Sequence, residues 1–209
     1  MNDSDKLVIA LPKGRLGKSA IERLIAIGIT PEIGHSTRKL VLNDEANKID
    51  VMFVKAGDVI TYIEEGVADI GVVGRDNILE ERADIYILKD LGFGKCTFCV
   101  AGYADRPYPA EGRPLKVATK YPNVARQFFK EKRQPIEVFY LSGSVELGPI
   151  VGLSDVIVDI VETGNTLKAN GLTVLEKMHD VSAKLIANKG KYRFKMARIK
   201  HIMQALERT

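Results

Sequence analysis

Short apolar runs alternate with segments of helical periodicity along almost the whole chain. Lys6–Leu11 and Ala68–Val73 are nearly continuous apolar runs, which are typical of strands covered on both faces of a sheet. Gly17–Ile27 carries apolar residues at helical spacing, and Gly28 follows it, a common residue just past a helix end. The alternation predicts helices layered on a sheet, the α/β class.

The same patterns predict the other elements. We expect helices at Asp58–Glu65, Pro122–Lys132, Ser144–Leu153 and Tyr192–Leu206, and strands at Asp50–Val54, Ile85–Leu88, Cys96–Ala101, Leu115–Thr119, Ile136–Tyr140, Val156–Ile160, Leu172–Lys177 and Ala183–Ala187. Asp105–Pro114 contains three prolines and a glycine and is therefore an irregular connection. The best division is two α/β lobes, residues 1–92 plus 173–209 and residues 93–172, with the ligand in the cleft between them.

The composition is ordinary for a soluble globular protein. Of 209 residues, 45% are hydrophobic and 28% are charged, and the net charge is +4. This mild positive charge suits polyanionic small substrates and gives no argument for nucleic acid. The polar N-terminus does not resemble a secretory signal, and no apolar run reaches the ~20 residues of a membrane helix. We therefore expect a cytoplasmic chain that uses neither membrane nor nucleic acid.

Three features of the chain are best interpreted as structural. Cys96 and Cys99 have redox-motif spacing, but they lie inside an apolar, strand-like run rather than at a helix start. The three histidines lack metal-ligand spacing. Six basic residues near the C-terminus could suggest RNA binding, but the apolar residues among them predict a docked helix with a solvated basic face.

The most informative segment joins an apolar strand to a Thr/Gly loop. Val156–Ile160 ends at the carboxyl edge of a sheet, where open α/β sheets place their ligands. Thr163, Gly164 and Thr166 then offer hydroxyl and backbone N–H groups at a helix start, which suits a phosphate. Asp159, just before the loop, can hold sugar hydroxyls. The combination predicts a site for a phosphoribosyl group.

Three successive strands of the N-terminal part end in a basic residue beside a glycine. Scattered surface charge would not favour this placement, so we interpret these strand ends as a second anion site. Asp76 has two open interpretations, as a cap of its helix or as a contact to ribose or base. The motifs are Lys13-Gly14-Arg15, Lys55-Ala56-Gly57 and Gly74-Arg75-Asp76.

Two further segments carry candidate residues with open alternatives. Ser142-Gly143-Ser144, followed by Glu146, is either a loop at the ligand edge or a capping arrangement of the next helix. Arg38 lies in a polar connection, where it could reach a phosphate or simply remain solvated.

Together these residues resemble the ATP phosphoribosyltransferases, which carry out the first step of histidine biosynthesis. The family pattern is a glutamate, five residues, glycine, a small residue, an apolar strand ending in aspartate, and a Ser/Thr-Gly-x-Thr-Leu loop. It runs here without a gap from Glu146 through Gly152 and Asp159 to Leu167. Leu11–Leu16, Gly66–Val72 and Ala118–Pro122 also resemble the family, so the likeness covers essentially the whole chain.

The resemblance implies a two-lobed fold like the type II periplasmic binding proteins, with the active site in the inter-lobe cleft. It also implies that the Asp159–Thr166 segment cradles the ribose-5-phosphate end of phosphoribosyl pyrophosphate, and that the basic strand ends meet pyrophosphate and the ATP phosphates. The family usually has arginine where Lys55 stands; lysine keeps the charge but not the bidentate fork. We expect catalytic roles for Asp159, Lys13 and Arg15, and substrate binding by Lys55, Gly74, Arg75, Asp76, Ser142, Gly143, Ser144, Glu146, Glu162, Thr163, Gly164, Asn165, Thr166 and Arg38.

Cofactor and partners follow from the same resemblance. Mg²⁺ would be held mainly by the substrate phosphates, and no protein ligands for it are identified. The length of 209 residues resembles the short form of the family, whose regulatory subunit is similar to histidyl-tRNA synthetase. Self-association into dimers is also expected.

Two other functions remain open at this point. A single-core purine or pyrimidine phosphoribosyltransferase also uses an acid and a Thr-Gly-x-Thr loop, but usually has two adjacent acids, whereas Ile160 follows Asp159 here. A solute-binding module could share the two-lobed fold, because fold does not fix function. Turnover of a free nucleobase would favour the first, and solute binding without turnover would favour the second.

Overall fold

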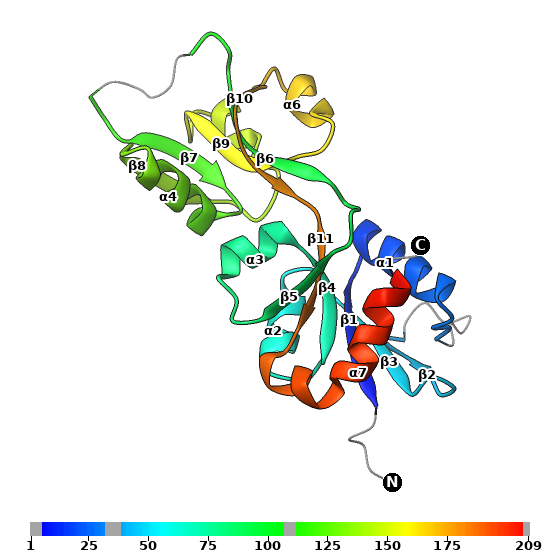
Figure 1. Ribbon diagram of the computed structural model, residues 1–209. Coiled ribbons are helices and arrows are strands. Elements are labelled where there is room, and N and C mark those ends of the chain that lie inside the picture. The colour runs from blue at the N-terminus through cyan, green and yellow to red at the C-terminus, as the bar shows by residue number, and fades with distance from the viewer. Residues whose placement is uncertain (1–5, 32–38, 107–111, 207–209) are drawn as a thin grey trace. The chain divides into compact units, whose positions relative to one another are not determined.

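The computed structural model describes residues 6–31, 39–106 and 112–206 (Figure 1). The chain forms two compact units, with Met1–Gly94 and Ser182–Thr209 in unit 1 and Lys95–Val181 in unit 2. The second boundary differs from the expected position at 172/173. The reason is that β10 (Thr173–Val181) pairs with β6 (Cys96–Gly102) and so completes the sheet of unit 2.

Unit 1 is built on a six-stranded sheet in the order β2-β3-β1-β4-β11-β5. β1 lies between β3 and β4 and is parallel to both, as the continuous apolar runs predict. β2 was not expected: it is a short, half-exposed strand that pairs antiparallel with β3. The strands are β1 (Leu7–Pro12), β2 (Val41–Asp44), β3 (Ile49–Val54), β4 (Ile70–Gly74), β5 (Tyr86–Asp90) and β11 (Ala183–Ala187).

Helices cover both faces of this sheet. On one face lie α1 (Arg15–Ala26) and α7 (Lys189–Leu206) (Figure 1). They contribute Leu24 and Ile199 to a core with Ile9 of β1. The alternate residue of β1, Ala10, faces the other core, which α2 (Asp58–Glu64) and α3 (Arg75–Glu81) cover. The two cores follow from the two-residue period of a strand.

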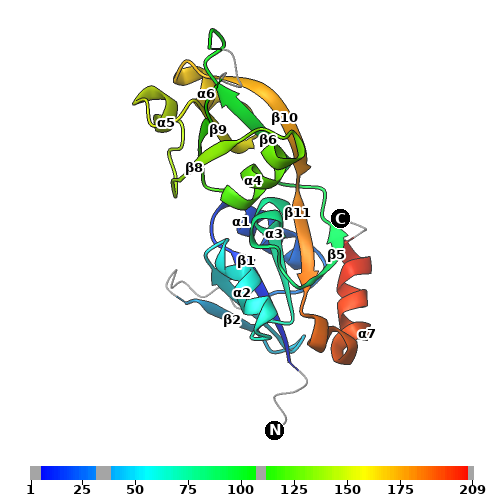
Figure 2. The ribbon, with the colours of Figure 1, turned by 90° about the vertical axis from the view of Figure 1, so that its left-hand side faces the viewer.

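The C-terminal helix docks on unit 1, as its apolar residues predict. The helix lies beside β5 (Figure 2). Ile199 and Ile202 are buried, and Tyr192 meets Tyr86 of β5 edge to face, with ring centroids 5.5 Å apart. Its cations are largely engaged with unit 1: Lys195 bonds Asp69, and an Arg198 Nη donates to the carbonyl of Asn47 at 2.6 Å. The docking prediction is therefore confirmed, but the prediction of a solvated basic face is wrong for these two side chains, because both bond the rest of unit 1.

Unit 2 contains a five-stranded sheet in the order β10-β6-β9-β7-β8. β7 (Leu115–Thr119), β8 (Ile136–Tyr140) and β9 (Val156–Val161) are parallel to one another. β6 runs antiparallel to β9, and β10 antiparallel to β6. α4 (Pro122–Glu131), α5 (Leu147–Ile150) and α6 (Asn165–Ala169) connect or cover these strands.

One expected helix of unit 2 is much shorter than predicted. Ser144–Leu153 was expected to be helical, but only Leu147–Ile150 is. Ser144 has φ 47 and Gly152 has φ 76, both in the left-handed region. The chain therefore turns at each end instead of continuing the helix.

In the described ranges, no helix combines the length and apolar character needed to cross a membrane.

Candidate functional site

Strand β9 delivers the central residues of the candidate site. Val156, Ile157 and Val158 are buried, and the strand continues one residue beyond the expected end, to Val161. The buried hydroxyl of Thr119 fixes the neighbouring end of β7: it donates to the carbonyl of Val158 at 2.6 Å. Asp159 therefore follows a firmly held strand segment.

A pocket of about 210 Å³, here called the loop pocket, lies where β9 passes into α6. It brings together the predicted acid and the predicted Thr/Gly loop, and adds Glu146 from the start of α5. This grouping is the one that the sequence motif implied. The lining residues are Glu146, Asp159, Ile160, Val161, Glu162, Thr163, Gly164, Asn165, Thr166 and Leu167.

The loop conformation suits an anion because of its backbone rather than because of a long helix. Gly164 is left-handed (φ 74, ψ 5), which lets successive N–H groups turn toward one concavity. α6 has only five residues, so a helix dipole contributes less than the sequence suggested. The hydroxyls of Thr163 and Thr166 remain beside these N–H groups, both on exposed residues.

Local contacts hold the acid and the loop in place. An oxygen of the Asp159 carboxylate accepts a hydrogen bond from the N–H of Ile160 at 2.8 Å. Leu167 is buried in a core cluster that includes Ile157 and Val145. The loop is thus anchored at both ends, which limits the motion of the groups between them.

The serine segment lies apart from the loop pocket. Ser142, Gly143 and Ser144 are exposed and do not line it, while Glu146 does. Among the two open interpretations, capping is not seen, because no side-chain cap bond is found at α5. A ligand role for these three residues stays a prediction.

The basic strand ends of unit 1 do share one edge of its sheet. Pro12 of β1 is in register with Val54 of β3, and the N–H of Lys13 donates to the carbonyl of Val54 at 2.7 Å. Lys55 follows directly, and Arg75 begins α3 after the parallel strand β4. Their side chains therefore start from neighbouring parallel strands, as predicted from their motifs.

Asp76 does not cap α3. Gly74 is the N-cap residue with no side-chain cap bond, and Asp76 is buried within the first turn. Its carboxylate accepts from the side-chain amide of Asn77 at 2.9 Å. A Cβ on Gly74 would lie 2.0 Å from Asp76 Oδ1, so the glycine at this strand end leaves space for the carboxylate.

Arg38 lies outside the described residues. Cys96 and Cys99 are both free thiols in β6, and burial raises the pKa of Cys99, in keeping with a structural role. Within the described part of the chain, no group of three histidine, cysteine, aspartate or glutamate side chains could hold a metal ion.

The comparisons with known proteins decide the family. Residues 55–208 match the family model described as HisG: ATP phosphoribosyltransferase, which covers well over half of the chain. This chain belongs to the ATP phosphoribosyltransferase family. The family member of that name from Clostridioides difficile is 54% identical over 203 residues, 97% of this chain and 98% of that protein. The one from Clostridium kluyveri is 43% identical over 208 residues, which are 99% of this chain and 95% of that protein.

Solved structures confirm the fold expected for the family. A HisG:HisZ complex of ATP phosphoribosyl transferase from Thermotoga maritima matches with a TM-score of 0.86 and 33% identity, covering 97% of both chains. The aliphatic sulphonate binding protein SsuA of Escherichia coli matches with a TM-score of 0.63 and 14% identity, over 97% of this chain and 67% of that one. The second likeness shows the periplasmic-binding-protein-like fold alone.

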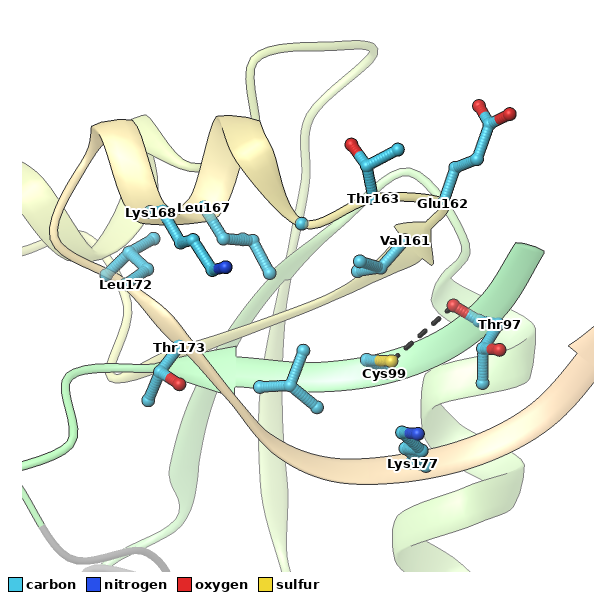
Figure 3. A pocket seen from close by; sticks show the side chains of 12 residues that line it. Thr97, Cys99, Val161, Glu162, Thr163, Leu167, Lys168, Leu172, Thr173 and Lys177 are labelled. Atoms are coloured by element: carbon cyan, nitrogen blue, oxygen red, sulfur yellow. Dashed lines mark hydrogen bonds between the residues drawn. The ribbon is translucent and has the colours of Figure 1, made fainter.

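Sequence reasoning missed one feature beside the ATP phosphoribosyltransferase motif. A second pocket of about 320 Å³, here called the strand pocket, shares Val161–Gly164 and Leu167 with the loop pocket. It extends over β6 and β10 instead of toward Asp159, and Lys168 and Lys177 line it (Figure 3). No motif marks these lysines, since only the pairing of β10 with β6 brings Lys177 near the loop. Its other lining residues are Thr97, Cys99, Leu172, Thr173 and Val174.

Proposed function

We propose that this chain transfers the phosphoribosyl group of phosphoribosyl pyrophosphate to N1 of the adenine of ATP. The products are N1-(5-phosphoribosyl)-ATP and pyrophosphate, and the reaction is the first step of histidine biosynthesis. The chain is then a pentosyltransferase, a kind of glycosyltransferase. The observation that carries the proposal is the loop pocket. In this chain, which belongs to the family, the pocket brings Glu146, Asp159 and the Thr/Gly loop together.

The loop pocket is proposed to hold the ribose-5-phosphate end of phosphoribosyl pyrophosphate. Backbone N–H groups around left-handed Gly164 and the hydroxyls of Thr163 and Thr166 match phosphate oxygens, with Asn165 beside them. Asp159 and Glu162 are proposed to accept hydrogen bonds from ribose hydroxyls. Their charge would also stabilise the positive charge that develops at C1 of the ribose in the transition state.

The basic strand ends of unit 1 are proposed to bind the phosphates of ATP and the pyrophosphate. Lys13 and Arg15 flank Gly14, whose φ of 92 only glycine adopts easily, so the chain turns sharply between them. Lys55 and Arg75 follow the neighbouring strands. A cluster of cations stabilises the departing pyrophosphate more than the bound substrate, because negative charge grows on it as the bond breaks.

The chemistry needs no general base. The lone pair on N1 of adenine attacks C1 of the ribose, the N1–C1 bond forms, and the bond from C1 to pyrophosphate oxygen breaks with its electron pair on the pyrophosphate. The protein therefore acts mainly by positioning two polyanions and by electrostatic stabilisation. Asp159, Lys13 and Arg15 carry these roles in the proposal.

Mg²⁺ enters the proposal as an ion carried by substrate phosphates. The described residues offer no group of three acidic, histidine or cysteine side chains, which argues against a cage made by the protein alone. When bound to the phosphates, Mg²⁺ would neutralise part of their charge. In the proposal, Asp159, Lys13 and Arg15 therefore contact substrates whose phosphates carry the ion.

The proposal includes a partner and a compartment. The matched Thermotoga maritima structure is a HisG:HisZ complex, and we infer that this chain likewise assembles with a regulatory subunit resembling histidyl-tRNA synthetase. Self-association into dimers is part of the same inference. Both substrates are phosphorylated metabolites that do not cross bilayers unaided, so we place the reaction in the cytoplasm.

A reaction assay tests the proposal. The purified chain, alone and with the purified regulatory subunit, is incubated with ATP, phosphoribosyl pyrophosphate and Mg²⁺, and phosphoribosyl-ATP is detected by mass and absorbance. Parallel reactions replace ATP by adenine or another free nucleobase. Product from ATP only is the expected result. Absence of phosphoribosyl-ATP both with and without the regulatory subunit would refute the proposal. Product from a free nucleobase would favour the activity of a single-core purine or pyrimidine phosphoribosyltransferase.

A further inference from the structure

The Ala118–Pro122 segment resembles the family but has no part in the proposed function. Its residue Lys120 directly follows β7, which lies between β8 and β9 in the sheet of unit 2. These three strands are parallel, so their carboxyl ends share the edge where such sheets place ligands. Lys120 is therefore a basic residue at a strand end of unit 2, like those that follow β1, β3 and β4 in unit 1.

Lys120 and Asp159 follow two residues that are paired across the sheet. Thr119, the last residue of β7, is in register with Val158 of β9, and its hydroxyl donates to the Val158 carbonyl at 2.6 Å. Lys120 comes next on one strand and Asp159 comes next on the other. Because β9 runs on through Asp159 into the loop pocket, the end of β7 lies beside this pocket.

The turn that carries Lys120 is held on both sides. The Thr119 hydroxyl accepts a hydrogen bond from the N–H of Tyr121 at 2.8 Å, and the Thr119 carbonyl accepts one from the N–H of Leu141 at 3.0 Å. Tyr121 is buried and meets Phe98 edge to face, with ring centroids 4.9 Å apart. The backbone of Lys120 is thus fixed between two buried residues, Thr119 and Tyr121.

The charge of Lys120 is not neutralised by the rest of unit 2. The residue is exposed, and its side chain forms no ion pair or hydrogen bond in the ranges that the structure describes. Lys132 of the same unit, in contrast, is paired with Glu176. The Lys120 ammonium lies 5.8 Å from the ring centroid of Tyr121, near the outer limit of a cation–π contact. The ring can orient the ammonium but leaves its charge for a ligand.

We propose that the ammonium of Lys120 binds the pyrophosphate group of phosphoribosyl pyrophosphate, an inference that rests on the proposed function. With the ribose hydroxyls on Asp159 and the 5-phosphate on the Thr/Gly loop, a cation beside Asp159 on the neighbouring strand meets the other end of the substrate, at C1. When the bond from C1 to the pyrophosphate oxygen breaks, its electron pair passes to the pyrophosphate. Lys120 stabilises this growing charge more in the transition state than in the bound substrate.

Calorimetric titration of the complete chain in Mg²⁺ buffer tests the contact with three probes. They are phosphoribosyl pyrophosphate, ribose 5-phosphate, which lacks the pyrophosphate, and ATP. In Lys120→Met the Kd of phosphoribosyl pyrophosphate is expected to rise about tenfold, because one charge-assisted contact is lost. The Kd of ribose 5-phosphate and that of ATP should keep their wild-type values. An unchanged Kd of phosphoribosyl pyrophosphate, or an equal rise for either of the other probes, would overturn the proposal.

Two further variants separate the position of the charge from its presence. Lys120→Arg keeps a cation at the turn and should retain most of the affinity for phosphoribosyl pyrophosphate. Lys130→Met removes an exposed cation of α4 and should leave all three Kd values unchanged. Equal losses of affinity in Lys130→Met and Lys120→Met would show that only net charge matters and would refute the assignment. Far-ultraviolet circular dichroism reports whether each variant is folded.

Turnover separates this inference from the proposed function. In Lys120→Met the kcat/KM for phosphoribosyl pyrophosphate should fall about tenfold or more, with the KM for ATP unchanged. If phosphoribosyl-ATP forms and Lys120→Met turns over like the wild-type chain, the contact is wrong and the proposed function stands. If no phosphoribosyl-ATP forms while Lys120→Met selectively weakens binding of phosphoribosyl pyrophosphate, the proposed function is wrong and the contact stands. A wild-type chain that does not bind phosphoribosyl pyrophosphate would overturn both.

Discussion

The carboxylate of Asp69 accepts a hydrogen bond from the ammonium of Lys195 at 2.7 Å, so the residue before β4 is joined to the C-terminal helix. Asp69 is fully buried, and the same oxygen also accepts from the N–H of Val8 at 2.7 Å. Its backbone carbonyl accepts from the N–H of Asn188 at 3.0 Å. One aspartate therefore ties β1, β4 and α7 together.

Removing either member of this pair should destabilise unit 1 strongly. Asp69→Ala removes the acceptor of the Val8 N–H and the counter-ion of Lys195, which keeps only the carbonyl of Lys6 as acceptor, and Lys195→Met leaves a buried carboxylate with less compensation. Each change is expected to lower the free energy of unfolding by about 3 kcal/mol, as for other broken buried pairs. Urea unfolding followed by circular dichroism measures this.

A control for this prediction lies on the same helix. Lys189 pairs with Asp84 at the surface, where both side chains are largely exposed (43% and 83%). Lys189→Met should therefore leave the free energy of unfolding almost unchanged, because exposed ion pairs contribute little to stability. Equal losses for Lys189→Met and Lys195→Met would show that burial of Asp69 is not the cause.

Gly74→Ala should impair substrate binding through Asp76. A Cβ at position 74 would have three near heavy atoms, all in the side chains of Asp76 and Asn77. The nearest is Asp76 Oδ1, at 2.0 Å. The added methyl group must displace this carboxylate, so the KM for ATP is expected to rise about tenfold if Asp76 contacts the nucleotide. Gly57→Ala, whose Cβ would meet nothing within 4 Å, should leave the KM unchanged.

A double-mutant cycle separates this mechanism from general damage. If displacement of the carboxylate is the whole effect, adding Gly74→Ala to an Asp76→Ala chain should cost little further activity. Fully additive losses would mean that the methyl group acts elsewhere.

Acid should weaken unit 1 partly through Asp90. The Lys184 ammonium, together with the N–H of Gly92, lowers the pKa of Asp90 to about 2. A carboxyl with a lowered pKa stabilises the fold above the unfolded pKa near 4, and this contribution is lost as the pH falls from about 4 to about 2. Because Asp90 is 56% exposed, the effect should stay below about 1 kcal/mol. Asp90→Asn should flatten the pH dependence of stability in this window; an unchanged slope would contradict the assignment.

The sequence predicted the elements whose hydrophobic pattern or motif is strong. The continuous runs of β1 and β4 and the motif around Asp159 indicated buried parallel strands and a strand-end loop, and both are found. The basic residues after β1, β3 and β4 were placed at one edge because parallel strands end together. Such predictions succeed because local pattern and global fold agree at these positions.

What the sequence could not predict depends on pairing between distant segments. β2 is short and half exposed, so its pattern is weak and only β3 defines it. The helix expected at Ser144–Leu153 fails because Ser144 takes a left-handed conformation that composition does not signal. β10 joins unit 2 through its partner β6, and this pairing is also what brings Lys177 to the strand pocket.

Gly164→Ala should weaken binding of phosphoribosyl pyrophosphate beyond its effect on stability. The left-handed conformation (φ 74) costs an alanine about 1 kcal/mol, and relief of this strain would turn the loop N–H groups away from a bound phosphate. We expect the KM for phosphoribosyl pyrophosphate to rise at least tenfold, and Gly164→Asn to recover part of it because asparagine tolerates this conformation. Gly152→Ala, also left-handed (φ 76) but outside the loop pocket, should show a similar loss of stability with an unchanged KM. If both alanine variants changed the KM equally, the effect would come from lost stability, and the loop could not be the phosphate cradle.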